Sequence, residues 1–315
     1  MATQARGSFR SALSHRDFRW LVSGLTVSSI GDWLYSVALL VWVFDETGSA
    51  AWVAAASIIR LLPSAIFGTL AGEIAGRYDR RLVMIATDTI RALMMLLLAA
   101  VAALTGYVSL GLALVFVSTA VGTLYFPAVA SLTPSLVGEE DLSAANAATS
   151  TIDTVALVVG PAIGGLLLLV GPVELGFLVN GLTFLVSALC ITRIHARSTL
   201  GLSEEEPGMI ARIVEGLRTI RRSREVSLLL FLETGSTFAY GQVLVLLVLV
   251  AEGLDAGDGG LGFMFAAAGA GGVVAAGLAA RLADDPRLGR TLLVASLAFS
   301  LPFAGLAFVE SPLPA

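Results

Sequence analysis

Long runs of apolar residues alternate with short polar connections along almost the whole of this sequence. A helix that crosses the roughly 30 Å hydrocarbon core of a bilayer needs about 20 mostly apolar residues, and nine runs reach that length. Apolar positions fill these runs instead of alternating with polar ones, so the pattern predicts membrane-spanning helices and not strands. The predicted spans lie at about 18–44, 51–75, 82–104, 108–127, 147–170, 173–194, 226–250, 260–280 and 290–309.

The composition supports an all-α polytopic membrane protein. The chain has 315 residues, of which 57% are hydrophobic and only 14% are charged, and its mean hydropathy is +0.88. A soluble protein of this length would need a larger polar surface. Residues 1–17 are polar, and the run that follows is too long for the core of a cleaved signal peptide, so we expect it to remain as a membrane anchor.

The sequence contains no pattern typical of an enzyme or a metal site. Its one cysteine, Cys190, lies in an apolar run, and its two histidines, His15 and His195, lie in separate polar flanks. We find no Ser/His/Asp set, no metal-ligand cluster and no phosphate-binding loop. We therefore expect no catalytic residues, no metal, no other cofactor and no nucleic-acid partner.

The distribution of arginine predicts the orientation. All 19 residues counted as lysine or arginine are arginines, and most lie in alternate connections between the runs. By the positive-inside rule, the N-terminus and these connections face the cytoplasm, in a multi-pass protein of the plasma membrane. The connection 128–146 is assigned to the same side by the helix count alone, because it has no arginine and carries Glu139, Glu140 and Asp141.

A long polar segment divides the chain unequally. We assign residues 1–194 to a complete six-helix half, 195–225 to a cytoplasmic linker and 226–315 to a second half with three helices. Apolar residues at helical spacing, with arginines on the other face, predict an amphipathic interfacial helix in the linker, with a solvated helix as the alternative. The second part weakly repeats the first at an offset of about 206 residues. Such repeats are typical of transporters whose substrate site lies between two halves.

The connection "GEIAGRYDRR" resembles the helix 2–3 signature of the major facilitator superfamily, G-x-x-x-D-R-x-G-R-R. Here Gly76 stands where that family has Asp, and Asp79 where it often has Gly. In the family this loop is a charge latch that stabilises the outward-open state, so the resemblance implies a cytoplasmic gate in which Asp79 or Glu73 replaces the missing carboxylate. The predicted gate residues are Gly72, Arg77, Asp79, Arg80, Arg81, Asp88 and Arg91.

A second stretch, "VVGPAIGG", resembles the Gly-Pro-x-x-Gly-Gly element of antiporters in that superfamily. The matching residues are Gly160, Pro161, Gly164 and Gly165. Glycines let helices approach closely and proline removes a backbone donor, although an ordinary packing face of small residues would look the same.

Longer stretches such as "GDWLYSVALLVWVFDETGSA" are similar to the branch that holds macrolide-efflux and enterobactin-exporter-type permeases. The resemblance implies a monomeric exporter of a drug-like or siderophore-like small molecule, working by alternating access with protons as the candidate coupling ion. A metabolite or sugar importer of the same fold and a truncated, non-transporting membrane protein are the alternatives.

Several ionisable residues fall inside predicted spans, where each costs at least about 2.5–3.5 kcal/mol, so they should face the bundle interior and find partners. We predict Asp32, Arg60 and Glu233 as candidates for substrate binding or proton coupling, and a pair between Asp32 and Arg60 is geometrically possible because their runs are antiparallel neighbours. A purely structural pair is the alternative. Asp88 and Arg91, three residues apart on one helical face, are interpreted as an extension of the latch.

Overall fold

The computed structural model describes residues 9–196 together with scattered residues between 218 and 274. The predicted spans at 226–250, 260–280 and 290–309 and the amphipathic linker helix lie wholly or largely outside the described residues, as does Glu233. The division of the chain into two halves therefore stays a prediction.

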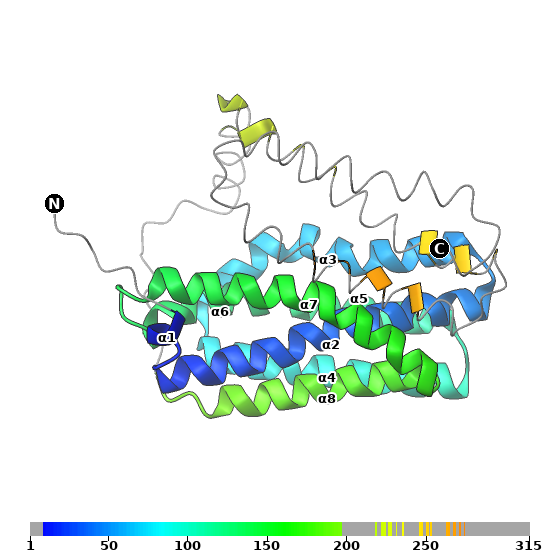
Figure 1. Ribbon diagram of the computed structural model, residues 1–315, viewed down its shortest axis with the longest axis horizontal. Coiled ribbons are helices and arrows are strands. Elements are labelled where there is room, and N and C mark those ends of the chain that lie inside the picture. Colours follow the sequence, from blue (N-terminus) through cyan, green and yellow to red (C-terminus); the bar gives the residue numbers. More distant parts are fainter. Residues whose placement is uncertain are drawn as a thin grey trace.

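Residues 9–196 form eight helices, the first of which is a single turn (Figure 1). Six segments of this described part are long and apolar enough to cross a membrane, in agreement with the six spans predicted there. The helices are α1 (Phe9–Ala12), α2 (Arg16–Thr47), α3 (Ala50–Arg77), α4 (Arg80–Leu104), α5 (Val108–Gly122), α6 (Tyr125–Leu136), α7 (Leu142–Val170) and α8 (Glu174–Thr192).

The boundaries of the fourth and fifth spans differ from the prediction. The fourth continues through α6 to Leu136, after a short break that follows Gly122, and α7 already begins at Leu142. Pro127 does not interrupt this span, because it lies in the first turn of α6, where a backbone N–H has no partner within the helix. The predicted connection 128–146 is thus wrong in length, and only residues 137–141 link the two helices.

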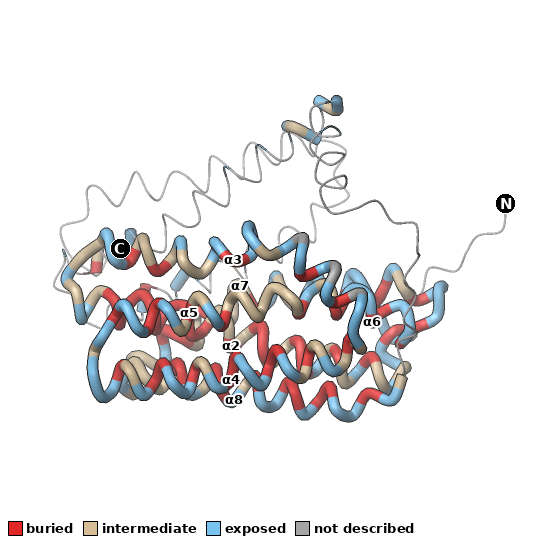
Figure 2. The backbone as a smooth tube through the Cα atoms, turned by 180° about the vertical axis from the view of Figure 1, so that it is seen from behind, coloured by how far each residue is buried: buried red, intermediate tan, exposed pale blue. Residues whose placement is uncertain are grey.

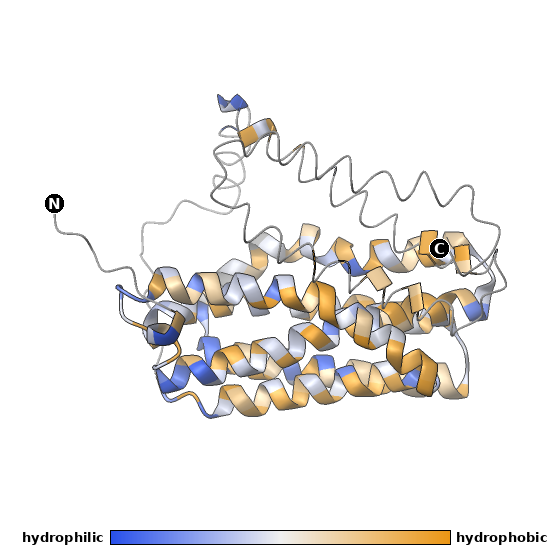
Figure 3. Ribbon diagram, in the orientation of Figure 1, coloured by the Kyte–Doolittle hydropathy of each residue, from blue (hydrophilic) through white to orange (hydrophobic). Residues whose placement is uncertain are grey.

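The first span lies in the middle of the bundle. Helix α2 packs along α7, α8 and α3, while α4 packs on α8 and α5. Figure 2 shows buried positions between the helices and exposed positions on their outer faces, and Figure 3 shows that the outer faces are largely apolar. On α8, for example, Leu178, Leu182, Leu185 and Leu189 form one exposed stripe. An apolar exterior is expected for helices surrounded by lipid tails.

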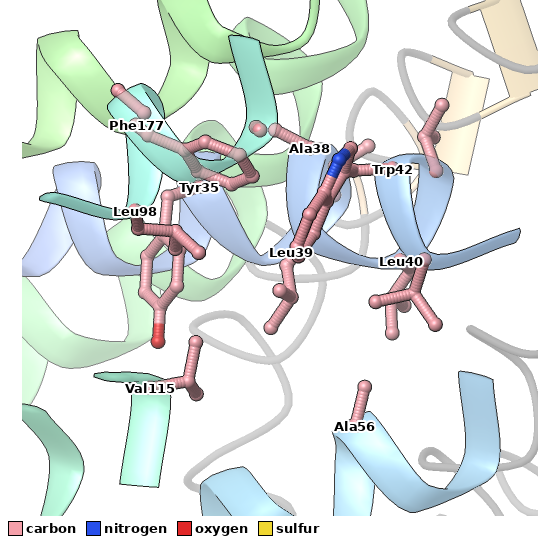
Figure 4. Close-up of a cluster of buried hydrophobic side chains, with 14 of the residues drawn as sticks. Tyr35, Ala38, Leu39, Leu40, Trp42, Ala56, Leu98, Val115 and Phe177 are labelled. Atoms are coloured by element: carbon pink, nitrogen blue, oxygen red, sulfur yellow. The ribbon is translucent and has the colours of Figure 1, made fainter. Parts of the chain in front are cut away.

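Close packing of large and small residues fixes the helices at one end of the bundle (Figure 4). The Trp42 ring of α2 meets the Phe177 ring of α8 edge to face, with ring centroids 6.1 Å apart. On α5, a Cβ atom added at Gly111 would collide with the Trp42 ring, so the glycine makes room for the indole. Packing of this kind holds membrane helices together, because lipid tails are as apolar as the side chains.

The connections predicted to share one side of the membrane do share one end of the bundle. Ser11 donates to Asp141 at 2.9 Å, and the Asp17 carboxylate accepts from the backbone N–H of His195 at 2.8 Å. Arg81 donates to the Thr192 carbonyl at 3.3 Å. Hydrophilic residues gather at this end, beside α1 (Figure 3). The acidic connection thus lies with the arginine-containing ones, as the helix count required.

Candidate functional site: a charged cluster inside the bundle

The cluster is built around an ion pair between α2 and α4. Asp32 lies near the middle of α2, and Arg91 lies near the middle of α4. One guanidinium nitrogen of Arg91, Nη2, donates to both carboxylate oxygens of Asp32 at 2.7 Å. The Asp32 side chain remains 27% exposed, whereas that of Arg91 is 11% exposed. The carboxylate is therefore the more accessible partner.

Arg60 reaches the same turn of α2 but does not form the ion pair that the sequence suggested. Its Nη2 donates to the backbone carbonyl of Asp32 at 3.4 Å. Its guanidinium lies 5.1 Å from the centre of the Tyr35 ring and 5.9 Å from that of Trp33, within the range of cation–π attraction. The Asp32 carboxylate is directed to α4 instead, so the partner of Asp32 is Arg91.

Two further residues shape the position of Arg91. The guanidinium carbon lies 4.1 Å from the centre of the Phe184 ring on α8. At the end of α5, a Cβ atom added at Gly122 would lie 3.2 Å from Nε of Arg91. The break after Gly122 thus leaves space for a large cation between α4 and α5. Neither Phe184 nor Gly122 carries a sequence signal that would have identified it.

Asp88 lies one turn before Arg91 on α4 and is completely buried. Neither of its carboxyl oxygens has a hydrogen-bond partner of ordinary geometry among the described residues. The Ser187 hydroxyl of α8 makes a weak polar contact with the carboxyl group, and it is hydrogen-bonded to the Tyr125 hydroxyl at 3.0 Å. Arg91 lies about 16 Å along the helix from Arg80 and pairs with Asp32. The role of Asp88 and Arg91 as an extension of the latch stays a prediction.

The Gly-Pro-x-x-Gly-Gly stretch packs directly against the segment of α2 that carries Asp32. All four matching residues are buried. A Cβ atom added at Gly160 would lie 2.9 Å from the carbonyl oxygen of Ile30, and one added at Gly164 would lie 2.6 Å from that of Leu34. Backbone therefore meets backbone on both sides of Asp32, which only glycine permits. The antiporter role of the stretch stays a prediction.

The loop between α3 and α4 is held by helix-end contacts. Asp79 caps α4 by accepting the backbone N–H of Arg81 at 2.9 Å. The Arg81 side chain donates to the carbonyl group of Thr192, the last residue of α8, where the helix dipole favours a cation. Arg77 ends α3, Arg80 is buried at the start of α4, and a Cβ atom added at Gly72 would meet no atom within 4 Å. The role of these residues as a gate stays a prediction.

The described residues thus hold six candidate membrane spans with an ion pair inside the bundle, and the sequence comparison gives the family. Residues 7–313 match the family described as transmembrane secretion effector, so the chain belongs to this family of major-facilitator transporters. Its members are multi-pass membrane transporters of the exporter type and not enzymes, as expected from the sequence.

Several of the matched relatives carry the name of an exporter or an efflux protein. BacE of Bacillus subtilis (strain 168), named as a bacilysin exporter, is 30% identical over 288 residues, which cover 90% of this chain and 72% of BacE. BacE of Bacillus amyloliquefaciens is 31% identical over 84% of this chain and 66% of that protein. Macrolide efflux protein A of Streptococcus pyogenes is 26% identical over 74% of this chain and 58% of that protein. The chain thus spans about two thirds of the length of the curated relatives it matches.

Proposed function

We propose that this protein exports a drug-like or siderophore-like small molecule across the plasma membrane, by alternating access coupled to inward proton movement. Its N-terminus lies in the cytoplasm, and a single copy is the working unit. The observation that carries the proposal is the Asp32 carboxylate, which lies near the middle of the α2 span, is partly exposed and is held by Arg91. The predicted contribution of Arg60 is to place a second cation beside the same turn of α2.

The carboxylate can bind a proton or a cationic group of a substrate, but not both at once. Either partner weakens its hold on Arg91 and removes a contact between α2 and α4. Two conformations that differ by a few kcal/mol respond strongly to such a change. An inward-moving proton supplies about 2.3 kcal/mol for each 100 mV of membrane potential, enough to drive the cycle.

The direction of transport rests on the relatives. BacE and macrolide efflux protein A are both named for export, and the buried Gly-Pro-x-x-Gly-Gly stretch beside Asp32 supports exchange of substrate for protons. The predicted latch consists of Asp79 and the arginines of the α3–α4 loop. Its presence supports a cycle in which the protein alternates between outward-open and inward-open states.

The proposal is tested with the full chain in lipid vesicles under an imposed pH gradient, with a radiolabelled macrolide antibiotic as the probe. We expect Asp32→Asn to lower gradient-driven transport at least about tenfold, because the amide neither binds a proton nor holds Arg91 as an ion pair. A pH-sensitive dye inside the vesicles reports the coupled proton movement. Glu139→Gln, an exposed carboxylate in the connection 137–141, is the matched control and should transport normally.

Undiminished transport by Asp32→Asn would contradict the role of this carboxylate. Movement of the probe with the proton, instead of against it, would favour an importer. Wild-type protein that moves neither the macrolide nor protons would support a membrane protein without transport activity.

A further inference from the structure

Asp88 is a buried carboxyl group that has no role in the proposed binding of protons and substrate at Asp32. Its side chain is 0% exposed, and in the described part of the chain it forms no ion pair and no hydrogen bond of ordinary geometry, so its polar contact there is a weak one with the Ser187 hydroxyl. A carboxylate removed from water without a partner costs several kcal/mol, whereas a neutral carboxylic acid costs much less. This conformation therefore favours a protonated Asp88.

Four groups face Asp88 from the surrounding helices. Arg91 lies one turn further along α4, Asp32 lies on α2, Ser187 on α8 and Tyr125 on α6. Arg91 is the only cation in this described set, and both hydrogen bonds of its Nη2 go to Asp32. The spacing of three residues places Asp88 and Arg91 on the same face of α4, where a change of rotamer would bring them together.

We propose that Asp88 is a second proton-binding site, which exchanges its proton for Arg91 whenever Asp32 loses its negative charge. A proton binds the Asp32 carboxylate and neutralises it, so the guanidinium of Arg91 is released. The guanidinium turns to Asp88, whose O–H bond breaks, and that proton leaves the site. One proton enters and one leaves, Arg91 keeps its charge, and one carboxylate is ionised before and after the exchange.

The positions of the two acids give this exchange a direction. Asp88 lies about 4.5 Å closer than Arg91 to the end of the bundle that holds the N-terminus. Its neighbours Ser187 and Tyr125 are linked by a hydrogen bond. With the N-terminus in the cytoplasm, as proposed above, the proton is received near mid-membrane and released one turn nearer the cytoplasm. The inference rests on the proposed function for this direction only.

Infrared spectroscopy of the full chain in vesicles at neutral pH, without substrate or gradient, tests the proposal. A protonated carboxyl group in an apolar site gives a C=O stretching band that an ionised one lacks. We expect the band of one such group in the wild type and its loss in Asp88→Asn. Asp88→Glu should keep a band, and Thr87→Val, a neighbouring buried position, should leave the spectrum unchanged.

A second pair of variants tests the exchange. In Asp32→Asn, Arg91 has no carboxylate but Asp88, so the band should disappear. In Asp32→Asn combined with Arg91→Gln, the competing cation is gone, and the band should return. An unchanged band in Asp88→Asn, or no band in the double variant, would overturn the proposal. Because no transport is measured, failure of the export assay leaves these outcomes unaffected, and the reverse also holds.

Discussion

At the scale of single residues, one buried carboxylate fastens the N-terminal segment to the bundle. Asp141 is 3% exposed, and its Oδ2 accepts a hydrogen bond from the Ser11 hydroxyl at 2.9 Å and one from Nε2 of His15 at 3.1 Å. The short helix α1 thereby packs on α7, with Ala12 fully buried. The acidic connection without arginines thus has its partners in the segment that precedes the first span.

We expect Asp141→Ala to release this segment. A hydrogen bond to a charged group contributes about 1.5–3 kcal/mol, so loss of one such bond should raise the population of the open form by roughly 10- to 150-fold. The measurement is maleimide labelling of an Ala12→Cys variant, whose thiol is buried while α1 is docked. Glu140→Ala, an exposed neighbour, is the control. Equal labelling rates in both backgrounds would show that Asp141 does not hold the segment.

The interior ion pair shows where inference from the sequence reaches its limit. The cost of a charge in hydrocarbon is enough to predict that Asp32, Arg60, Asp88 and Arg91 face the interior. It does not choose among partners, because the choice depends on how each helix is rotated and on which helices touch. Runs adjacent in sequence suggested Arg60, whereas the rotation of α2 directs Asp32 to Arg91 on α4.

At the scale of helices, the contact between α2 and α7 depends on small residues. The approach of Gly160 and Gly164 to the α2 backbone brings α7 against the turns on either side of Asp32. Glycine-rich stretches are common in membrane helices, so the sequence predicts a close contact without naming the partner helix. The partner is α2, whose geometry near Asp32 therefore depends on α7.

We expect Gly160→Ala to destabilise the protein by about 1–3 kcal/mol, because the added methyl group must push two backbones apart. Gly72→Ala is the matched control, since its added methyl group meets nothing within 4 Å. Replacing a glycine inside a helix should by itself stabilise by up to about 1 kcal/mol. Thermal unfolding in detergent measures both. Equal midpoints for the two variants would mean that α2 and α7 can separate at little cost.

At the scale of the whole molecule, successive connections between the described spans lie alternately at the two ends of the bundle. The extents of four of the six described spans could be predicted closely, because hydrocarbon thickness demands apolar runs of a given length. The short connection before α7 could not be predicted, because Ser, Asn and Ala residues occur in loops and in helices alike. Hydrogen bonds hold four segments together at one end of the bundle: the N-terminal segment, the α3–α4 loop, residues 137–141 and the segment after α8. Only the arginines indicate which side of the membrane this end faces.

The orientation can be measured with single cysteines in a Cys190→Ala background. Thr105 lies at the end of the bundle opposite α1, and Ser14 lies beside α1; both are exposed. With the N-terminus in the cytoplasm, a membrane-impermeant reagent added to intact cells should label Thr105→Cys at least tenfold faster than Ser14→Cys. Permeabilised cells should label both. The reverse pattern in intact cells would invert the proposed topology.

The central position of α2 has a consequence for biosynthesis. Helix α2 leaves the ribosome before the other described spans, yet it packs mainly on α7 and α8, and roughly 130 residues separate its end from the start of α8. At about 5–20 residues per second, that length takes on the order of 10 s to synthesise. Before α4 is synthesised, the Asp32 carboxyl group lies in lipid or in the translocation channel without Arg91 as its partner. Among the described spans, α2 is therefore made first and acquires its main packing partners only when α7 and α8 have been synthesised.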